Sequence, residues 1–242
     1  LVGYMSAQGI REYSKLVRLE LGYRWTLLIY GVFGLLVTGY FGDRFFLFMP
    51  LGFFGVASLI PLLRLRNPQR EVKAEVLQLA AAILGYIWIP FFLSFFVLIG
   101  RAEPGAVGLL LLLGFGVALS DVLAFTVGKA FGGPKLLTNV SPNKTWAGVA
   151  GNFIGAYLAF MLMGFAIPQD WSNVTAAILP AVVALGAIWG DLVESLAKRG
   201  FGVKDAGDLL PGFGGLLDRI DSLLLAMPLS YYAMKVLQYF TT

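Results

Sequence analysis

Two pairs of carboxylates stand near the ends of apolar segments, where they could bind a cation. Asp191 and Glu194 are three positions apart, as are Asp218 and Asp221, so each pair shares one helix face. Such oxygen ligands suit a hard cation, first of all magnesium, because the chain has no histidine and no cysteine. A salt-bridge network at helix ends is the structural alternative. The cost of burying so much charge without a task favours metal binding.

Basic and glycine-rich residues accompany these carboxylates. Ammonium and guanidinium groups suit the phosphates that a bound cation would help to orient. The glycine-rich run 211–215 lets the backbone approach a ligand closely, which makes Gly214 and Gly215 candidate binding residues. The basic candidates are Lys198, Arg199, Lys204 and Arg219.

Two further polar features interrupt the apolar pattern. Segment 132–148 offers hydroxyl, amide and ammonium donors just before an expected helix N-terminus, a combination that favours an anion site. We expect an irregular loop there, because Pro142 and the glycines break regular structure. An ordinary turn, with a helix cap at Ser141 or Asn143 and a lysine that serves only topology, is an equal alternative. The donors are Ser141, Asn143, Lys144 and Thr145.

Asp121 follows Ser120 inside a long apolar run. A carboxylate there is costly unless it faces a polar cavity or pairs with a cation. We therefore treat Asp121 as a candidate site residue, with a structural ion pair as the alternative.

The elements that must position these groups are membrane helices. Of 242 residues, 58% are hydrophobic and 13% charged, and apolar runs near twenty residues recur. The pattern predicts an all-α, polytopic integral membrane protein with about seven visible spans. Residues 1–9 are typical of the end of an earlier span, so we expect a segment upstream, and Pro90 predicts a kink. The expected spans are 24–41, 45–63, 74–99, 105–128, 146–167, 174–197 and 217–239.

The basic residues alternate in density between successive connections. Fifteen of the 18 Lys and Arg residues fall on one side of the expected topology, and only Arg44, Arg101 and Lys235 on the other. The positive-inside rule then predicts that the basic side, with every candidate residue, faces the cytoplasm. Topology also accounts for the net charge of +4 without a nucleic-acid partner. We expect one membrane domain over 1–242, with helices of uncertain role in 1–104 and the catalytic half in 105–242.

The candidate residues resemble the phosphatidate cytidylyltransferase family, also called CDP-diacylglycerol synthases. Residues 195–221 match a long signature of that family without gaps, and a match of this length is highly specific. The block S-P-N-K-T-W-A-G at 141–148 and the pair Ser120-Asp121 are also similar to the family's. The resemblance covers the C-terminal half, from the fourth expected span onward. One position departs, because Phe213 replaces the histidine of the signature. The matching residues are Ser195, Lys198, Arg199, Lys204, Asp205, Gly207, Leu210, Pro211, Gly212, Gly214, Gly215, Asp218, Arg219 and Asp221.

The resemblance implies transfer of a cytidylyl group from CTP to phosphatidic acid, giving CDP-diacylglycerol and pyrophosphate. It implies that Asp191 and Asp218 are the principal Mg²⁺ ligands, with Asp121 and Asp221 as supporting groups or ligands of a second cation. The same basic residues, together with Lys144, would hold the triphosphate and the lipid phosphate. We assign catalytic roles to Asp121, Lys144, Lys198, Arg219 and Asp221.

Several alternatives stay open. The chain could act on another lipid phosphate, or Phe213 could mark a catalytically silent lipid-binding paralogue. A cation transporter is less favoured, because the carboxylates gather at one face and no internal repeat is visible. The family resemblance is also compatible with a homodimer.

Overall fold

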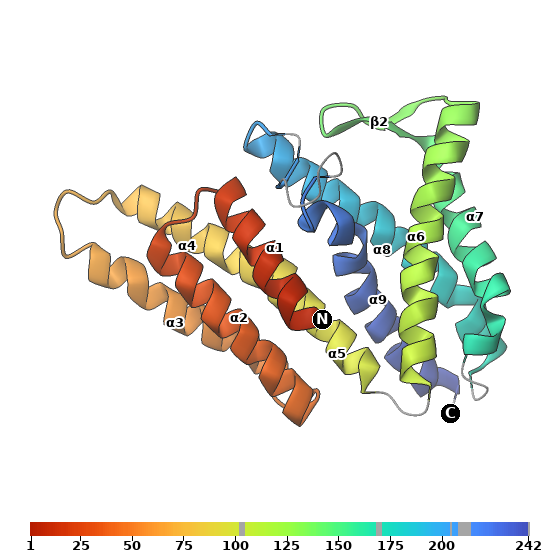
Figure 1. The fold of residues 1–242 in the computed structure, drawn as a ribbon, viewed down its shortest axis with the longest axis horizontal. Coiled ribbons are helices and arrows are strands. Elements are labelled where there is room, and N and C mark those ends of the chain that lie inside the picture. Colours follow the sequence, from red (N-terminus) through yellow and green to blue (C-terminus); the bar gives the residue numbers. More distant parts are fainter. Residues whose placement is uncertain (102–104, 168–170, 204, 208–213, 242) are drawn as a thin grey trace. The chain divides into compact units, whose positions relative to one another are not determined.

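The chain is almost entirely helical, and the expected all-α membrane fold is confirmed. The computed structural model describes residues 1–101, 105–167, 171–203, 205–207 and 214–241 (Figure 1). Five described helical stretches are long and apolar enough to cross a bilayer, and two apolar helices have 17 residues. These seven correspond to the seven expected spans: α2 (Leu21–Phe41), α3 (Phe48–Arg64), α4–η1–α5 (Val72–Gly100), α6 (Ala106–Phe131), α7 (Trp146–Leu162), α8 (Asn173–Gly200) and α9 (Leu217–Thr241).

Residues 1–9, expected as the end of an earlier span, are part of the first helix, α1, which runs over Val2–Leu16. Arg18 follows it with a φ of 51°, a left-handed conformation that stops the helix and turns the chain toward α2.

Two compact units make up the fold. The first contains Leu1–Arg101 and Asp205–Arg219, and the second contains Ala102–Lys204 and Ile220–Thr242. In the first unit α2 and α3 lie beside the long α4–α5 helix (Figure 1). Stacked rings form part of its core, with the centroids of Phe53 and Tyr86 4.3 Å apart.

Pro90 widens a helix turn in this unit. The turn over Ile87–Phe91 is a π-helix (η1) between α4 and α5, and the Ser94 hydroxyl donates a 2.8 Å hydrogen bond to the Pro90 carbonyl. A widened turn accommodates a residue that cannot donate to the helical ladder. The helix therefore contains a π-turn at the position of the predicted kink.

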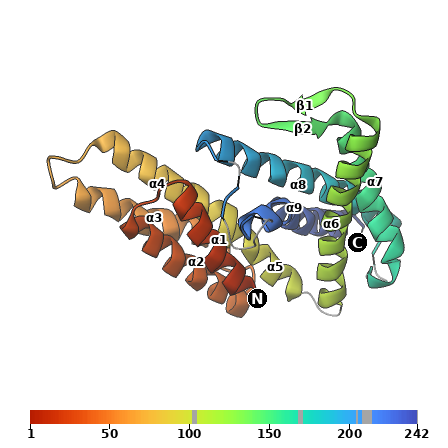
Figure 2. The same cartoon turned by 45° about the horizontal axis from the view of Figure 1, so that its top comes forward.

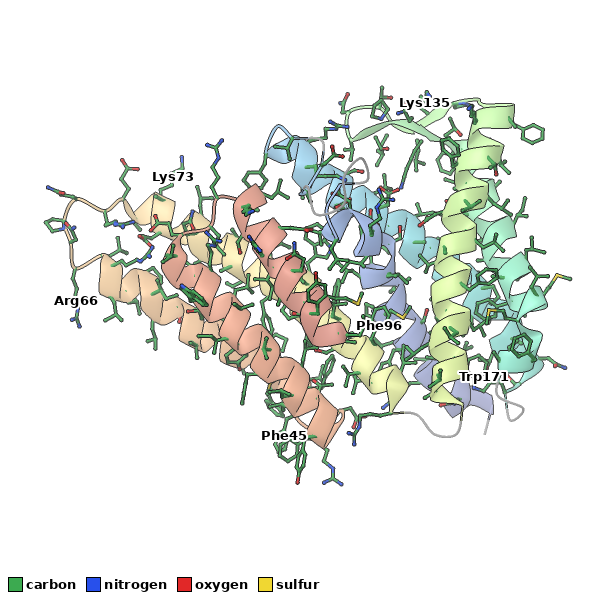
Figure 3. The ribbon with its side chains drawn as sticks, in the orientation of Figure 1. Phe45, Arg66, Lys73, Phe96, Lys135 and Trp171 are labelled. Atoms are coloured by element: carbon green, nitrogen blue, oxygen red, sulfur yellow. The ribbon has the colours of Figure 1, made fainter. Side chains whose placement is uncertain are left out.

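An ion network joins the ends of α2, α3 and α4. Arg70 lies 3.0 Å from Glu20 and 3.1 Å from Glu75, and Arg64 lies 2.5 Å from Glu20. The Tyr23 hydroxyl also donates to Glu75, whose side chain is only 2% exposed. Several donors thus compensate a carboxylate that would be costly to bury alone. Figure 3 shows Arg66 and Lys73 near this end of the helices and Phe45 at the opposite end.

In the second unit, glycines bring helix backbones into contact. A Cβ added at Gly155 of α7 would lie 2.5 Å from the Leu119 carbonyl oxygen of α6, and one at Gly190 of α8 would lie 2.4 Å from the Asp221 carbonyl oxygen of α9. Such close approach of backbones is how apolar membrane helices gain packing energy.

The segment expected as an irregular loop instead forms a β-hairpin, so that prediction was wrong. Strands β1 (Lys135–Leu137) and β2 (Ser141–Thr145) pair antiparallel, with Lys135 opposite Thr145 and Leu137 opposite Ser141 (Figure 2). Pro142 is tolerated because both strands of a two-stranded sheet are edges.

We predict that Gly155→Ala destabilises the protein by about 1–3 kcal/mol, because the added methyl must push α6 away from α7. Gly114→Ala, on α6 with nothing within 4 Å of the added Cβ, is the matched control and should not destabilise. Thermal unfolding in detergent measures both. Equal melting temperatures for the two variants would contradict this packing.

Candidate active site

Asp121 has polar neighbours on two adjacent helices, α6 and α7. Asn152 of α7 donates to the Ser120 hydroxyl at 3.2 Å and to the Asp121 carboxylate at 3.4 Å. Ser120 is fully buried and Asn152 nearly so. The Asn152 amide therefore compensates Asp121. Asn152 was not among the candidates recognised in the sequence, although a single polar side chain inside an apolar helix was a signal that could have identified it.

Asp191 of α8 is bound through both carboxylate oxygens. Lys144 places its Nζ 2.7 Å from Oδ2, and the Ser195 hydroxyl lies 3.2 Å from Oδ1. Lys144 belongs to β2, so this ion pair ties the hairpin to α8. The pair remains partly exposed, with 25% of the Lys144 side chain and 34% of the Asp191 side chain accessible.

Thr145 fixes where α7 begins. Its hydroxyl accepts the Gly148 N–H at 3.1 Å, and the side chain is 4% exposed. The cap is therefore Thr145 rather than Ser141 or Asn143. Because Thr145 adjoins Lys144, the cap also fixes the lysine next to the helix N-terminus.

Three carboxylates from three helices converge in the second unit. The charge of Asp121 interacts with those of Asp191 and Asp221, and Lys144 supplies opposite charge. Beside them, Lys198 binds Glu194 at 2.6 Å, with the Glu194 side chain only 1% exposed. All of these charged residues are candidates recognised in the sequence, and the structure brings them together.

This donor set matches a hard cation in chemical kind, since it consists of carboxylate, amide and hydroxyl oxygens. In the part of the chain that the structure describes, no three acidic side chains are close enough to form a complete metal cluster. The ammonium of Lys144 instead compensates Asp191. A bound cation would have to share the Asp191 carboxylate with Lys144 or displace the lysine from it.

Asp218 belongs to the first unit and holds a loop together. Its oxygens accept the N–H groups of Ala206, at 2.9 Å and 3.2 Å, and of Gly215, at 2.8 Å. Gly214 has a φ of 81°, which favours glycine, and faces Asp218 closely. The pairing of Asp218 with Asp191 of the second unit as metal ligands stays a prediction.

The other predicted binding residues belong to both units. Arg219 and Asn143 are exposed and Ser141 is half-buried. Arg199 makes a long contact, 3.5 Å from Nε to the Val140 carbonyl, which brings it to the hairpin. Lys204 and Phe213 lie outside the described residues.

The cytidylyltransferase family model matches residues 1–237 of the 242. The chain belongs to the cytidylyltransferase family. A phosphatidate cytidylyltransferase of Thermotoga maritima is 34% identical over 245 residues, which cover 98% of this chain and 88% of that protein. The family match therefore extends over the N-terminal half, beyond the half in which motifs were recognised.

Two further relatives of the same name match over shorter segments. The Mycobacterium leprae protein is 38% identical over 160 residues, or 65% of this chain and 50% of that protein. The Brucella abortus protein is 45% identical over 114 residues, or 46% of this chain and 41% of that protein. The chain thus matches half or less of the length of these two family members.

We predict that the Lys144–Asp191 pair contributes little to stability, because water reaches both groups. A double-mutant cycle of Lys144→Met and Asp191→Asn, followed by thermal unfolding, should give a coupling of about 0.5–1 kcal/mol. A coupling of several kcal/mol would instead identify the pair as a structural element of the unit.

Proposed function

We propose that this protein transfers the cytidylyl group of CTP to phosphatidic acid, releasing pyrophosphate and forming CDP-diacylglycerol. The observation that carries the proposal is the convergence of Asp121, Asp191 and Asp221 with Lys144 in an apolar helical protein. Family membership and the name phosphatidate cytidylyltransferase, which the relatives carry, support it.

The chemistry needs charge compensation more than proton transfer. A phosphate oxygen of the lipid attacks the α-phosphorus of CTP, the new P–O bond forms, and the bond to pyrophosphate breaks. The attacking oxygen is already anionic, so no general base is required, which suits a chain without histidine. Repulsion between two anions is the main barrier, and positioned cations lower it.

The chain's own cations can meet this demand. Lys144 pairs with Asp191 in this structure, and on substrate binding its ammonium becomes available to a phosphate oxygen. Lys198, held on α8 by Glu194, and Arg199 beside it lie in the same unit. Arg219, exposed at the start of α9, serves the same purpose in the first unit.

We further propose that the reaction uses Mg²⁺. When bound, this ion withdraws charge from phosphate oxygens. Asp191 and Asp218 would hold it, and Asp121 and Asp221 would support it or serve a second cation. Oxygen donors of this type, in a chain without histidine or cysteine, support magnesium over softer metals.

The site is proposed to face the cytoplasm, where CTP is available. In each unit the connections rich in Lys and Arg lie at one end of the helices. Figure 3 shows Lys135 of the hairpin and Trp171 toward opposite ends of α6 in the second unit. The positive-inside rule assigns the basic ends to the cytoplasmic side.

Activity is tested with purified protein, phosphatidate, Mg²⁺ and CTP labelled in its α-phosphate. We expect label in a lipid product, and a loss on the order of 100-fold or more in Asp191→Asn, since a carboxylate proposed to hold the charge-compensating cation is removed. Glu71→Gln, an exposed carboxylate at the start of α4, is the matched control. No lipid-linked CMP from any lipid phosphate would refute the enzyme. Label only with another lipid phosphate would support the alternative substrate.

We expect Phe213→His to change turnover by less than about tenfold, because the proposed reaction needs no general base or acid at that position. General acid–base catalysis is typically worth roughly 100-fold or more. The comparison is of kcat for the two proteins at saturating CTP. A gain of that size would show that proton transfer limits this chain.

Orientation is open to a direct test, because the chain contains no cysteine. An impermeant maleimide added to intact cells should label Phe45→Cys, which replaces an exposed residue between α2 and α3. Gln69→Cys, between α3 and α4, should react only after lysis. The reverse pattern would contradict a cytoplasmic site.

A further inference from the structure

Glu12 of α1 is a buried carboxylate that no step of the proposed reaction uses. Glu12 as a whole residue is 4% exposed. Oε1 accepts the N–H of Leu216 at 3.0 Å and Oε2 that of Leu217 at 2.8 Å, across more than 200 positions in sequence. The Gln8 side chain donates to the same carboxylate at 2.8 Å.

These contacts place Glu12 at the start of α9. The first N–H groups of a helix have no partner within the helix and form the positive end of its dipole. A carboxylate is a strong acceptor for such donors. The cap of α9 thus comes from the opposite end of the sequence, within the first unit.

Two glycines make room for Glu12. A Cβ added at Gly207 would lie 3.0 Å from the Glu12 Cγ, and one at Gly215 would lie 2.5 Å from its Oε2. Real Cβ atoms essentially never approach as closely as the second of these. Both glycines belong to the signature recognised in the sequence. The close approach that they permit is therefore to a side chain of the protein itself.

Glu12 and Asp218 divide the backbone donors around the start of α9. Glu12 takes Leu216 and Leu217, while Asp218 takes Ala206 and Gly215. Asp218 is the second residue of α9. The point where the helix starts therefore sets the direction of its carboxylate.

We infer that Glu12 is a positioning residue for the reaction, which fixes the first turn of α9 and with it Asp218. The inference rests on the proposed function for the role of Asp218. Glu12→Gln keeps the size of the side chain but replaces one acceptor oxygen with an amide donor. That donor cannot bind a backbone N–H, so one of the two hydrogen bonds is lost.

The test compares Glu12→Gln with Glu75→Gln, the other deeply buried glutamate of the first unit, in the full-length protein in lipid nanodiscs. Glu12→Gln should lower kcat roughly 10- to 100-fold with little change in the KM for phosphatidate, as expected of misplaced reacting groups. Hydrogen exchange at Leu216 and Leu217 should accelerate. Glu75→Gln should lower the melting temperature but leave kcat and exchange at these two amides unchanged.

Unchanged kcat and unchanged exchange in Glu12→Gln would overturn the inference while leaving the proposed function intact. An equal fall in kcat in Glu75→Gln would also overturn it, by reducing Glu12 to general stability. If the wild-type protein makes no product, the proposed function fails, and the exchange measurement alone decides whether Glu12 fixes α9. If Glu12→Gln does not fold, Gly207→Ala is the second variant, because its added methyl contacts and displaces Glu12. Its kcat and its hydrogen exchange at Leu216 and Leu217 are measured and interpreted in the same way.

Discussion

A carboxylate inside an apolar helical protein requires a cation or several hydrogen-bond donors, since water does not solvate it there. This requirement accounts for how the chain joins distant segments. Arginines from the end of α3 and the connection after it compensate Glu75, and Lys198 compensates Glu194. Lys144 pairs with Asp191, which is partly exposed. Backbone N–H groups compensate Glu12 and Asp218. Most of these pairings link one helix to another helix, to the hairpin or to a loop. The Lys198–Glu194 pair instead lies within a single helix, α8.

The two kinds of partner have different consequences for function. A lysine side chain is flexible and can move to a substrate phosphate, and the Lys144–Asp191 pair is accessible enough for such an exchange. Backbone donors are fixed by the fold, so Glu12 and Asp218 hold one arrangement of the loop and the first turn of α9. The protein therefore combines a rigid frame with a cation that is free to change partner. Both suit the proposed reaction, in which two anions must be brought together.

Much of this architecture could be predicted from hydropathy, because apolar runs long enough to cross a bilayer form helices. The expected spans 24–41 and 174–197 fall within three residues of α2 and α8. The charged candidates were recognisable because charge is rare in such a chain. The hairpin could not be predicted, because its strands are short, one of them contains a proline, and strand pairing depends on tertiary context. Glu12 was also missed, because its partners lie at the other end of the sequence.

We propose that the converging carboxylates bind a cation beside the phosphates of CTP. Anomalous X-ray scattering from crystals grown with Mn²⁺ and a non-hydrolysable CTP analogue can locate that cation. We expect a Mn²⁺ peak in contact with the Asp191 carboxylate and a triphosphate oxygen, with Lys144 moved from Asp191 to a phosphate. A bound nucleotide with Lys144 still on Asp191, and no metal peak at that carboxylate, would contradict it.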